Sequence, residues 1–419
     1  MNTTSTLHSR SCLLLGDERS AVSSEVLELS ADEQQQLVAG ARDLAPVRGL
    51  THGFYKYPAR FSPAFARAAI SAFTQPGDLV VDNHMGGGTT LVEALALGRR
   101  VIGVDISALA EFVATVKTTL LDEDDLERLS AWAARAAKCI NIHKASAKLT
   151  DYAELGYYKH LDHASRWRIR KGIEQTLHSV QRVGCERLEA FGRCVILRTA
   201  QWALDGRKAP PTICEFRERL LYYAGKMIAG AREFSVAVRN CGGSSDLRIL
   251  NRSAAGLEHE PLLRAAGVPR LVLTSPPYPG IHVLYHRWQV GGGRESPVPF
   301  IIANKLDGAG SSYYTMGDRN YPKLKTYFDK IRASMASVAA VADRRTVVVQ
   351  MVAFSDPTWQ LPRYLEAMEK AGFVEAYLRT LRSQGDGRLW RTVPGRRWYS
   401  DQRGETPGSQ EVVLLHKKR

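Results

Sequence analysis

The sequence predicts an α/β fold in which a doubly wound parallel sheet is interrupted by a helical insert. Apolar runs at residues 79–81, 100–105, 271–273 and 346–352 read as buried strands, and helical patterns lie between them. Strands that alternate with helices are typical of a parallel sheet with helices on both faces. Between about 118 and 245 the strand pattern stops, and this part of the chain reads as helical and basic. A chain of 419 residues is long enough for two domains, or for one domain with a large insert.

A glycine-rich turn follows the first of these strands. The strand at 79–81 leads into Asp82-Asn83-His84-Met85-Gly86-Gly87-Gly88-Thr89-Thr90, and an amphipathic helix is predicted at 91–97. Glycines permit a tight turn and a close approach of the backbone to a ligand, and the N-terminus of a helix offers free N–H groups. The turn lacks the dinucleotide fingerprint Gly-x-Gly-x-x-Gly. It also lacks the lysine of a phosphate-binding loop.

The next strand ends in an acid that completes a candidate ligand site. Asp105 closes the run at 100–105, roughly 20 residues after the first glycine, which suits hydrogen bonding to ribose hydroxyls. The turn and the acid together predict a site for a nucleoside without phosphate handling, and S-adenosylmethionine fits that description. Glu93, in the helix after the turn, is expected to face solvent.

A second element, far along the chain, ends a strand abruptly. The apolar run at 271–273 is followed by Ser275-Pro276-Pro277-Tyr278. Two prolines remove two backbone donors and fix φ, so the strand cannot continue past Ser275. What remains is a rigid lip that carries a hydroxyl, free carbonyls and an aromatic ring, which suits a flat ring bearing an amine. The alternative is an ordinary proline turn at the end of a strand.

In these motifs the chain resembles the amino-methylating, site-specific DNA methyltransferases, which act on N4 of cytosine or N6 of adenine. The cofactor element of that family typically reads Asp-Pro-Phe-x-Gly-x-Gly-Thr-Thr, and the turn at 82–90 matches it except at Asn83 and His84. The catalytic element of the family, Asp/Asn/Ser-Pro-Pro-aromatic, matches residues 275–278. Residues 56–61, Lys-Tyr-Pro-Ala-Arg-Phe, resemble the segment that closes over the methionine part of the cofactor.

The resemblance implies a Rossmann-like S-adenosylmethionine-dependent methyltransferase sheet, with a role for each matching residue. The expected catalytic residues are Ser275, Pro276, Pro277 and Tyr278. The expected cofactor-binding residues are Tyr57, Pro58, Phe61, Asp82, Gly86, Gly88, Thr89, Thr90 and Asp105. No metal is expected, because His282 and His286 have no cysteine or acid ligands nearby.

The implied reaction is methyl transfer from S-adenosylmethionine to N4 of a cytosine that is flipped out of double-stranded DNA. In this family Ser-Pro-Pro-Tyr is commoner in N4-cytosine enzymes. The alternatives are DNA adenine N6 methylation, tRNA guanine N2 methylation and a catalytically silent DNA-binding subunit. Methylation at carbon 5 of cytosine is not expected, because its enzymes use a Pro-Cys pair that this chain lacks.

The chain divides into four parts. We expect a lead at 1–45, the cofactor-binding half of the methyltransferase domain at 46–117, a helical basic insert at 118–245, and the catalytic half at 246–419. The insert is a candidate target-recognition region, and a solvated helical cap is an equal alternative. Two further candidates are a long glycine-rich loop at 291–319 and residues 388–399, where arginines mix with aromatic residues.

Composition and charge limit the kinds of partner that we expect for this chain. The formal net charge of +14 suits a polyanion such as double-stranded DNA. A cognate restriction endonuclease is a possible second partner. The six cysteines form no Cys-x-x-Cys pair and are expected to be reduced and mostly buried. No signal peptide or membrane-length apolar run is present, so we expect a cytoplasmic protein without a membrane partner.

Overall fold

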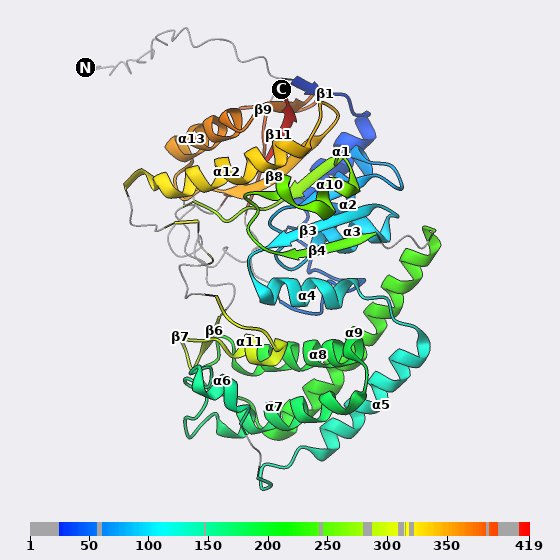
Figure 1. Cartoon of the computed structure of the whole chain (residues 1–419), viewed down its shortest axis with the longest axis vertical. Helices are drawn as coiled ribbons and strands as arrows, with labels where there is room; N and C mark the ends of the chain where they lie inside the picture. Colours follow the sequence, from blue (N-terminus) through cyan, green and yellow to red (C-terminus); the bar gives the residue numbers. More distant parts are fainter. Residues whose placement is uncertain are drawn as a thin grey trace, which may run out of the picture.

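A computed structural model describes residues 25–56, 61–145, 148–242, 246–279, 287–308, 314, 316–317, 322–382, 385–392 and 410–419. Figure 1 shows a sheet with its helices in the upper half of the molecule and a group of helices, α5 to α9 with α11, in the lower half. Helix α4 (Ala108–Thr118) lies between the two groups. The chain therefore forms an α/β unit and a helical unit that meet at α4.

The large sheet has one order and one main direction. Its strands are β1 (Glu25–Leu27), β2 (Leu79–Asp82), β3 (Arg100–Asp105), β4 (Leu247–Asn251), β5 (Leu271–Thr274), β8 (Val347–Ala353), β9 (Phe373–Leu378), β10 (Leu389–Thr392) and β11 (Gln410–Lys418). The order is β1-β9-β11-β8-β5-β2-β3-β4, with β10 paired to β11. All pairings are parallel except those that β11 makes. The predicted fold class is therefore confirmed.

The order of the strands locates the place where a ligand is expected. From β2 the chain adds β3 and β4 on one side, and later adds β5 and β8 on the other side. The direction of winding thus reverses between β2 and β5. In open α/β sheets, ligands bind beyond the carboxyl ends of the strands at such a switch point.

Helices cover both faces of the sheet because successive strand residues point to opposite faces. Val347 and Val349 pack against α1 to α3, whereas Val348 packs against α12 and α13. The first face carries α1 (Ala31–Arg42), α2 (Pro63–Phe73) and α3 (Thr89–Ala96). The second face carries η2 (Leu257–His259), α10 (Pro261–Ala266), α12 (Lys325–Val341), which follows η4 (Pro322–Leu324), and α13 (Pro357–Lys370).

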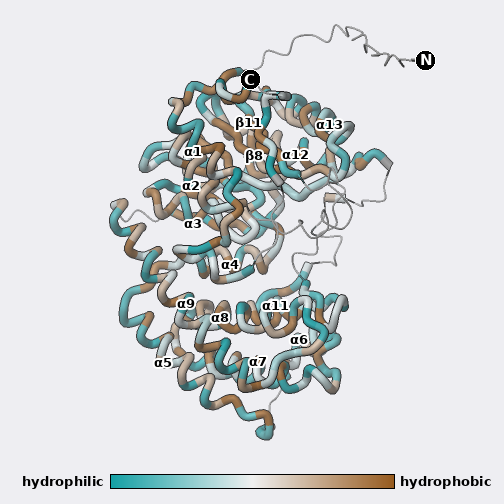
Figure 2. The backbone as a smooth tube through the Cα atoms, turned by 180° about the vertical axis from the view of Figure 1, so that it is seen from behind, coloured by the Kyte–Doolittle hydropathy of each residue, from teal (hydrophilic) through white to brown (hydrophobic). Residues whose placement is uncertain are grey.

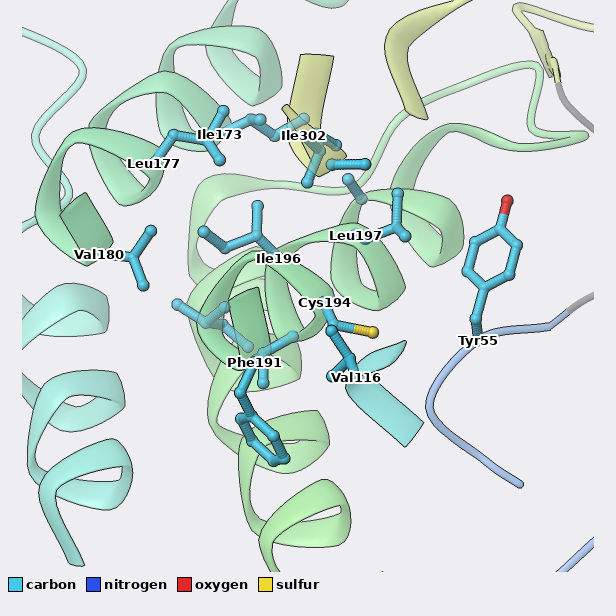
Figure 3. Close-up of a cluster of buried hydrophobic side chains, with 14 of the residues drawn as sticks. Tyr55, Val116, Ile173, Leu177, Val180, Phe191, Cys194, Ile196, Leu197 and Ile302 are labelled. Atoms are coloured by element: carbon cyan, nitrogen blue, oxygen red, sulfur yellow. The ribbon is translucent and has the colours of Figure 1, made fainter. Parts of the chain in front are cut away.

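The hydrophobic core of the helical unit also includes residues of the α/β unit. The helical unit comprises α5 (Glu123–Cys139), α6 (Thr150–Glu154), α7 (Trp167–Val180), η1 (Gln181–Val183), α8 (Glu186–Leu204), α9 (Ile213–Asn240) and α11 (Val298–Ala303). In Figure 3, Val116 of α4, Ile302 of α11 and Tyr55 surround α8. Figure 2 shows hydrophilic and hydrophobic stretches alternating along α5 and α9, as expected for helices with one face in a core. This common core fixes the helical unit against the sheet.

Two expectations about local structure are wrong. The segment predicted as a loop at 291–319 begins in a hairpin of β6 (Trp288–Val290) and β7 (Arg294–Ser296), with all three turn glycines at positive φ, and continues into the buried helix α11. The helix α3 is not amphipathic, because every residue from Thr89 to Ala96 is buried. In both cases packing against neighbouring elements decides the structure. Glycine content and periodicity are local properties and do not indicate this packing.

The expectation that the cysteines are mostly buried is also wrong. Of the five described cysteines, only Cys194 is buried, and Cys139, Cys214 and Cys241 are exposed near the ends of surface helices. All five are free thiols, as expected from their spacing, and Cys12 lies outside the described residues. In the described parts of the chain, no helix combines the length and the apolar character that crossing a membrane requires.

Two glycines of α9 provide a matched test of how closely this helix packs. A Cβ at Gly230 would overlap the carbonyl oxygen of Leu50, whereas a Cβ at Gly225 would meet nothing within 4 Å. We expect Gly230→Ala to lower the free energy of unfolding by about 1–3 kcal/mol, because backbone must move. Gly225→Ala should raise it by up to about 1 kcal/mol through helix propensity. Urea unfolding of both variants measures this, and equal effects of the two would contradict the close crossing of α9 over residue 50.

Candidate active site

The glycine turn joins β2 to α3 through backbone conformations that favour glycine. Gly86 has φ +47° and Gly88 has φ +70°, both in the left-handed region. Gly88 is the N-cap of α3 and has no side chain to occupy the first free N–H groups. The buried Lys117 of α4 donates from Nζ to the carbonyl oxygen of Gly87. The turn is therefore fixed from behind by a charged hydrogen bond.

Two aspartates lie on either side of this turn. Asp82 is buried at the end of β2, where it accepts hydrogen bonds from the N–H of His84 at 3.2 Å and from the hydroxyls of Thr90 and Thr274. Burial raises the pKa of Asp82 to about 6, against the opposing effect of these hydrogen bonds.

Asp105 ends β3 and is only partly exposed. Its two carboxylate oxygens accept from the N–H groups of Gly86 and Ser107, each at 2.9 Å. Burial raises the pKa of Asp105 to about 6, and the backbone hydrogen bonds oppose that rise. Asp105 thus holds the glycine turn while its carboxylate stays at the carboxyl edge of the sheet.

The Ser-Pro-Pro-Tyr lip begins where β5 ends, as predicted, and three hydrogen bonds hold it. Ser275 Oγ donates to the carbonyl oxygen of Met351 at 2.9 Å. The hydroxyl of Tyr327 donates to the carbonyl oxygen of Pro277 at 2.8 Å. The hydroxyl of Tyr278 donates to Glu411 Oε1 at 2.6 Å. The lip is therefore tied to β8, α12 and β11, and its geometry is set by the sheet.

A buried ion pair supports Tyr278. Glu411 accepts from Arg391 Nε at 2.7 Å through its other oxygen, and Arg391 also donates to the carbonyl oxygen of Ala41 at 3.1 Å. Both charged side chains are almost fully buried. Arg391 belongs to the segment 388–399, which was a candidate for phosphate contacts. Its guanidinium is used inside the protein, and residues 393–409 lie outside the described part of the chain.

The glycine turn and the lip meet across the β2–β5 pairing. Oγ1 of Thr90, whose hydrogen bonds Asp82, lies 3.3 Å from the carbonyl oxygen of Leu273. Nδ1 of His84 lies 3.4 Å from the hydroxyl oxygen of Thr274, 190 positions along the chain. Burial lowers the pKa of His84 to about 4, so its ring is neutral at pH 7. The structure therefore places the candidate cofactor element beside the candidate catalytic element.

The predicted site residues do not all lie in this cluster. The residues that the structure brings together are Asp82, Gly86, Gly88, Thr89, Thr90, Asp105, Ser275, Pro276, Pro277 and Tyr278. Phe61 is 5 % exposed and packs edge-on against Phe65 in the core. Tyr57, Pro58, His282 and His286 lie outside the described residues.

A buried polar cluster, which the sequence does not predict, lies behind the turn. Glu93 was expected to face solvent but is 3 % exposed. A hydrogen bond of 2.7 Å joins its Oε1 to Nε2 of the buried His52, and Arg67 Nε lies 2.9 Å from its Oε2. The cluster ties α3 to α2 and to the segment around residue 52. Since Glu93 is surrounded by apolar neighbours in sequence, no local pattern indicates these partners.

The donor and acceptor set suits a nucleoside that carries a cationic tail. The turn presents N–H groups at the start of α3, and two acids with pKa values near 6 flank it. Acceptors of this kind bind ribose hydroxyls and ammonium groups. No Lys or Arg follows the glycines as a phosphate ligand. The residues that are present therefore fit S-adenosylmethionine better than a nucleotide. The described residues include no group of His, Cys, Asp or Glu that could hold a metal ion.

Known proteins are similar to this chain in the cofactor half of the site. Residues 27–115 match the family model N6_N4_Mtase, described as DNA methylase. This segment runs from β1 to α4 and contains the glycine turn and Asp105, but it does not reach the lip. The predicted resemblance is thus confirmed for the cofactor half. That family implies S-adenosylmethionine as cofactor.

Two curated relatives match over a similarly short stretch. The type II methyltransferase M.MjaII of Methanocaldococcus jannaschii is 33% identical over 78 residues, which is 19% of this chain and 15% of the relative. The type II methyltransferase M.MvaI of Kocuria varians is 38% identical over 82 residues, 19% of this chain and 18% of the relative. The match therefore spans less than a fifth of the length of either relative.

Solved structures resemble the chain only weakly. The rRNA methyltransferase AviRa of Streptomyces viridochromogenes has a TM-score of 0.35 and 11% identity, over 89% of this chain and 91% of AviRa. A SAM-dependent methyltransferase of Agrobacterium tumefaciens has a TM-score of 0.29 and 10% identity, over 85% of this chain and 60% of that protein.

The raised pKa of Asp105 predicts how pH acts on the site. Its carboxyl titrates near 6 in the folded protein, against 3.8 as the ordinary value, so the folded state binds more protons between about pH 4 and 6. The contribution of Asp105 to stability is therefore present at low pH and falls as pH rises through that window.

Affinity for S-adenosylmethionine should rise as pH rises through the same window, because the ionised carboxylate is the better acceptor. Calorimetric titration at pH 5, 6 and 7.5 measures it, and Asp105→Asn should reduce the pH dependence, with the remainder due to Asp82. An unchanged profile in Asp105→Asn would contradict this assignment.

Proposed function

We propose that this chain, in which residues 27–115 match the family model N6_N4_Mtase, described as DNA methylase, transfers a methyl group to the exocyclic amine of a base in DNA. The observation that carries the proposal is the position of the Ser-Pro-Pro-Tyr lip beside the glycine turn, at the switch point of the sheet. A rigid set of amine acceptors therefore lies next to a site suited to S-adenosylmethionine.

Ser275 acts as an acceptor for the target amine. Its own hydroxyl hydrogen is donated to the carbonyl oxygen of Met351, so the lone pairs of Oγ remain for an incoming N–H. The carbonyl oxygen of Pro276 supplies the second acceptor. Two such hydrogen bonds favour a pyramidal nitrogen, whose lone pair is otherwise delocalised into the base. S-adenosylmethionine, when bound, supplies an electrophilic methyl group. Positioning and electrostatics carry the rate, because a serine hydroxyl is a weak base.

Tyr278 forms a fixed wall for the base. The residue is 8 % exposed, and Glu411 accepts a hydrogen bond from its hydroxyl. A ring held in this way can stack on a flat base without losing side-chain freedom on binding. The target must leave the duplex first, because in a base pair its amine faces the partner base. The substrate is therefore a flipped-out nucleotide of double-stranded DNA.

The base that we propose is cytosine, methylated at N4. This choice rests on Ser275, since Ser-Pro-Pro-Tyr is the commoner form of the element in N4-cytosine enzymes of the resembling family. Adenine N6 is the runner-up, because both amines need similar acceptors. A paired restriction endonuclease is part of the proposal, supported by the type II methyltransferases that the cofactor half resembles.

Mass spectrometry of nucleosides tests the proposed reaction. DNA is incubated with the protein and deuteromethyl-labelled S-adenosylmethionine, and we expect labelled N4-methylcytosine. Ser275→Ala should reduce the label at least 10²-fold, the size of effect found when a key hydrogen-bonding group is removed. Ser337→Ala, a buried serine of α12 that bonds the N–H of Gly256, is the matched control. Labelled N6-methyladenine would keep the mechanism and replace the base. In a parallel incubation with RNA, label in RNA and none in DNA would refute a DNA substrate.

Variants at Tyr278 separate its ring from its hydroxyl. Tyr278→Ala should weaken methyl transfer far more than cofactor binding, because the wall of the base pocket is lost. Tyr278→Phe keeps the ring and removes only the hydrogen bond to Glu411, so it should retain most of the activity. Transfer rates under saturating cofactor and calorimetric cofactor affinity measure the two effects. Equal losses of transfer and of cofactor affinity in Tyr278→Ala would remove Tyr278 from the base pocket.

A further inference from the structure

Cationic and aromatic side chains gather on one surface formed by α8, α9 and the loop between them. We define the arginine–aromatic patch as Arg198, Trp202, Arg207, Arg219, Tyr222 and Tyr223. The guanidinium groups of Arg207 and Arg219 each lie 4.6 Å from the centre of the Trp202 ring. The guanidinium of Arg198 lies 4.5 Å from the centre of Tyr223, and Lys226 lies 6.0 Å from that of Tyr222. Each cation is thus held against a ring by a cation–π contact.

The cations of the patch lack the partners that other arginines of the helical unit have. Arg170, Arg187 and Arg193 pair with acids inside the unit. Among the described residues, no salt bridge is formed by the three arginines of the patch or by Lys226. One acid lies near. The pKa of Glu215 is lowered, first by hydrogen bonds from Thr212 and also by Arg207. The patch therefore keeps an excess of positive charge that an anion can neutralise.

The stacked arrangement prepares the arginines for phosphate. An aromatic ring supports the face of a guanidinium and leaves its N–H groups for hydrogen bonds. In the patch, Arg198 uses Nη1 to donate to Oε1 of Gln201 at 3.3 Å. Arginine edges bind phosphate oxygens with two parallel hydrogen bonds. Tyr222 is 51% exposed, so its ring is also accessible to a sugar or an unpaired base. Charge and geometry together match a nucleic-acid backbone better than an acidic protein surface.

Hydrogen bonds fix the patch to both segments that flank the active site. Gln201, within the same stretch of α8, donates to the carbonyl oxygen of Lys56 at 2.9 Å and accepts from its N–H at 3.1 Å. Lys56 begins the segment that precedes the glycine turn. After α8, the N–H of Gly206 donates to the carbonyl oxygen of Gln289 at 2.8 Å, in the hairpin that follows the lip. The stretch of chain that carries the patch is therefore anchored to residues that lie close in sequence to both elements of the site.

We propose that the arginine–aromatic patch binds the phosphate backbone of the duplex DNA whose target base enters the active site. The inference rests on the proposed function and adds the surface that holds its substrate. Contacts to phosphates position a duplex without reading its sequence. The patch thus supplies affinity and register, and base recognition is left to other residues.

A second basic surface of the helical unit provides the competing location. A pocket of about 430 Å³ between α5 and the α7–η1 corner is lined in part by Arg128, Arg135 and Arg182. Arg135 and Arg182 are exposed and form no salt bridge with the described residues. The described residues that line this pocket include none from the segments flanking the active site. A double variant at Arg135 and Arg182 removes two positive charges from the helical unit, as a double variant of the patch does.

The experiment compares Arg207→Gln/Arg219→Gln with Arg135→Gln/Arg182→Gln in the full chain. Fluorescence anisotropy with a labelled DNA duplex gives the affinity between about 50 and 200 mM salt. For the patch variant we expect the slope of log affinity against log salt to fall by about 0.9 for each lost phosphate contact. The loss of affinity should be equal for duplexes of different sequence. The pocket variant should bind as the wild type does, and both should keep the wild-type melting temperature and cofactor affinity.

A third variant separates the effect of charge from the effect of the contact with the ring. Arg219→Lys keeps the charge but loses the planar stack, so it should keep the wild-type salt slope with weaker affinity. A wild-type slope in the patch variant, or a loss confined to the pocket variant, would overturn the proposal. Tighter binding of duplex RNA than of duplex DNA would also overturn it. If the wild type binds DNA through the patch but transfers no label, the proposed methyl transfer fails and the DNA-binding surface stands.

Discussion

The pairing of β2 with β5 is the constraint on which the rest of the site depends. Val80 pairs with Leu271 and Val81 with Val272, so the two strands end at the same edge of the sheet. Because the strands are parallel, both carboxyl ends carry their next residues to one place: Asp82 with the glycine turn on one side, and the Ser-Pro-Pro-Tyr lip on the other. A shift of this register by one residue would turn every side chain of β5 to the opposite face and displace the lip.

Around this edge, buried polar groups keep both elements in place. Lys117 and Asp105 hold the glycine turn from α4 and β3. Glu411 of β11 and Arg391 of β10 hold Tyr278. Breaking a buried ion pair by removing one partner is costly, because the other charge is then left without compensation in a medium of low polarity. The groups that shape the site are thus also groups whose loss destabilises the fold.

The positive charge of the chain serves two separate purposes. Between residues 123 and 240 there are 21 Lys and Arg against 14 Asp and Glu. Some of these arginines, such as Arg187 with Asp125, join helices of the helical unit. Those of the arginine–aromatic patch are stacked on rings at the surface. Net charge alone predicts a polyanionic partner, but only the pairing of each side chain indicates which cations remain to meet it.

Sequence patterns were enough to predict the fold class, the glycine turn, the end of β5 at the lip and the helical character of the insert. These depend on local properties: strand and helix periodicity, the conformational freedom of glycine and the missing donor of proline. The tertiary structure alone decided the burial of Glu93, the helix α11 within an expected loop and the use of Arg391 inside the protein. Each of these depends on a partner far along the chain, as with Tyr278 and Glu411, 133 positions apart. Periodicity carries no information about such partners, because they meet only after the sheet has brought distant strands together.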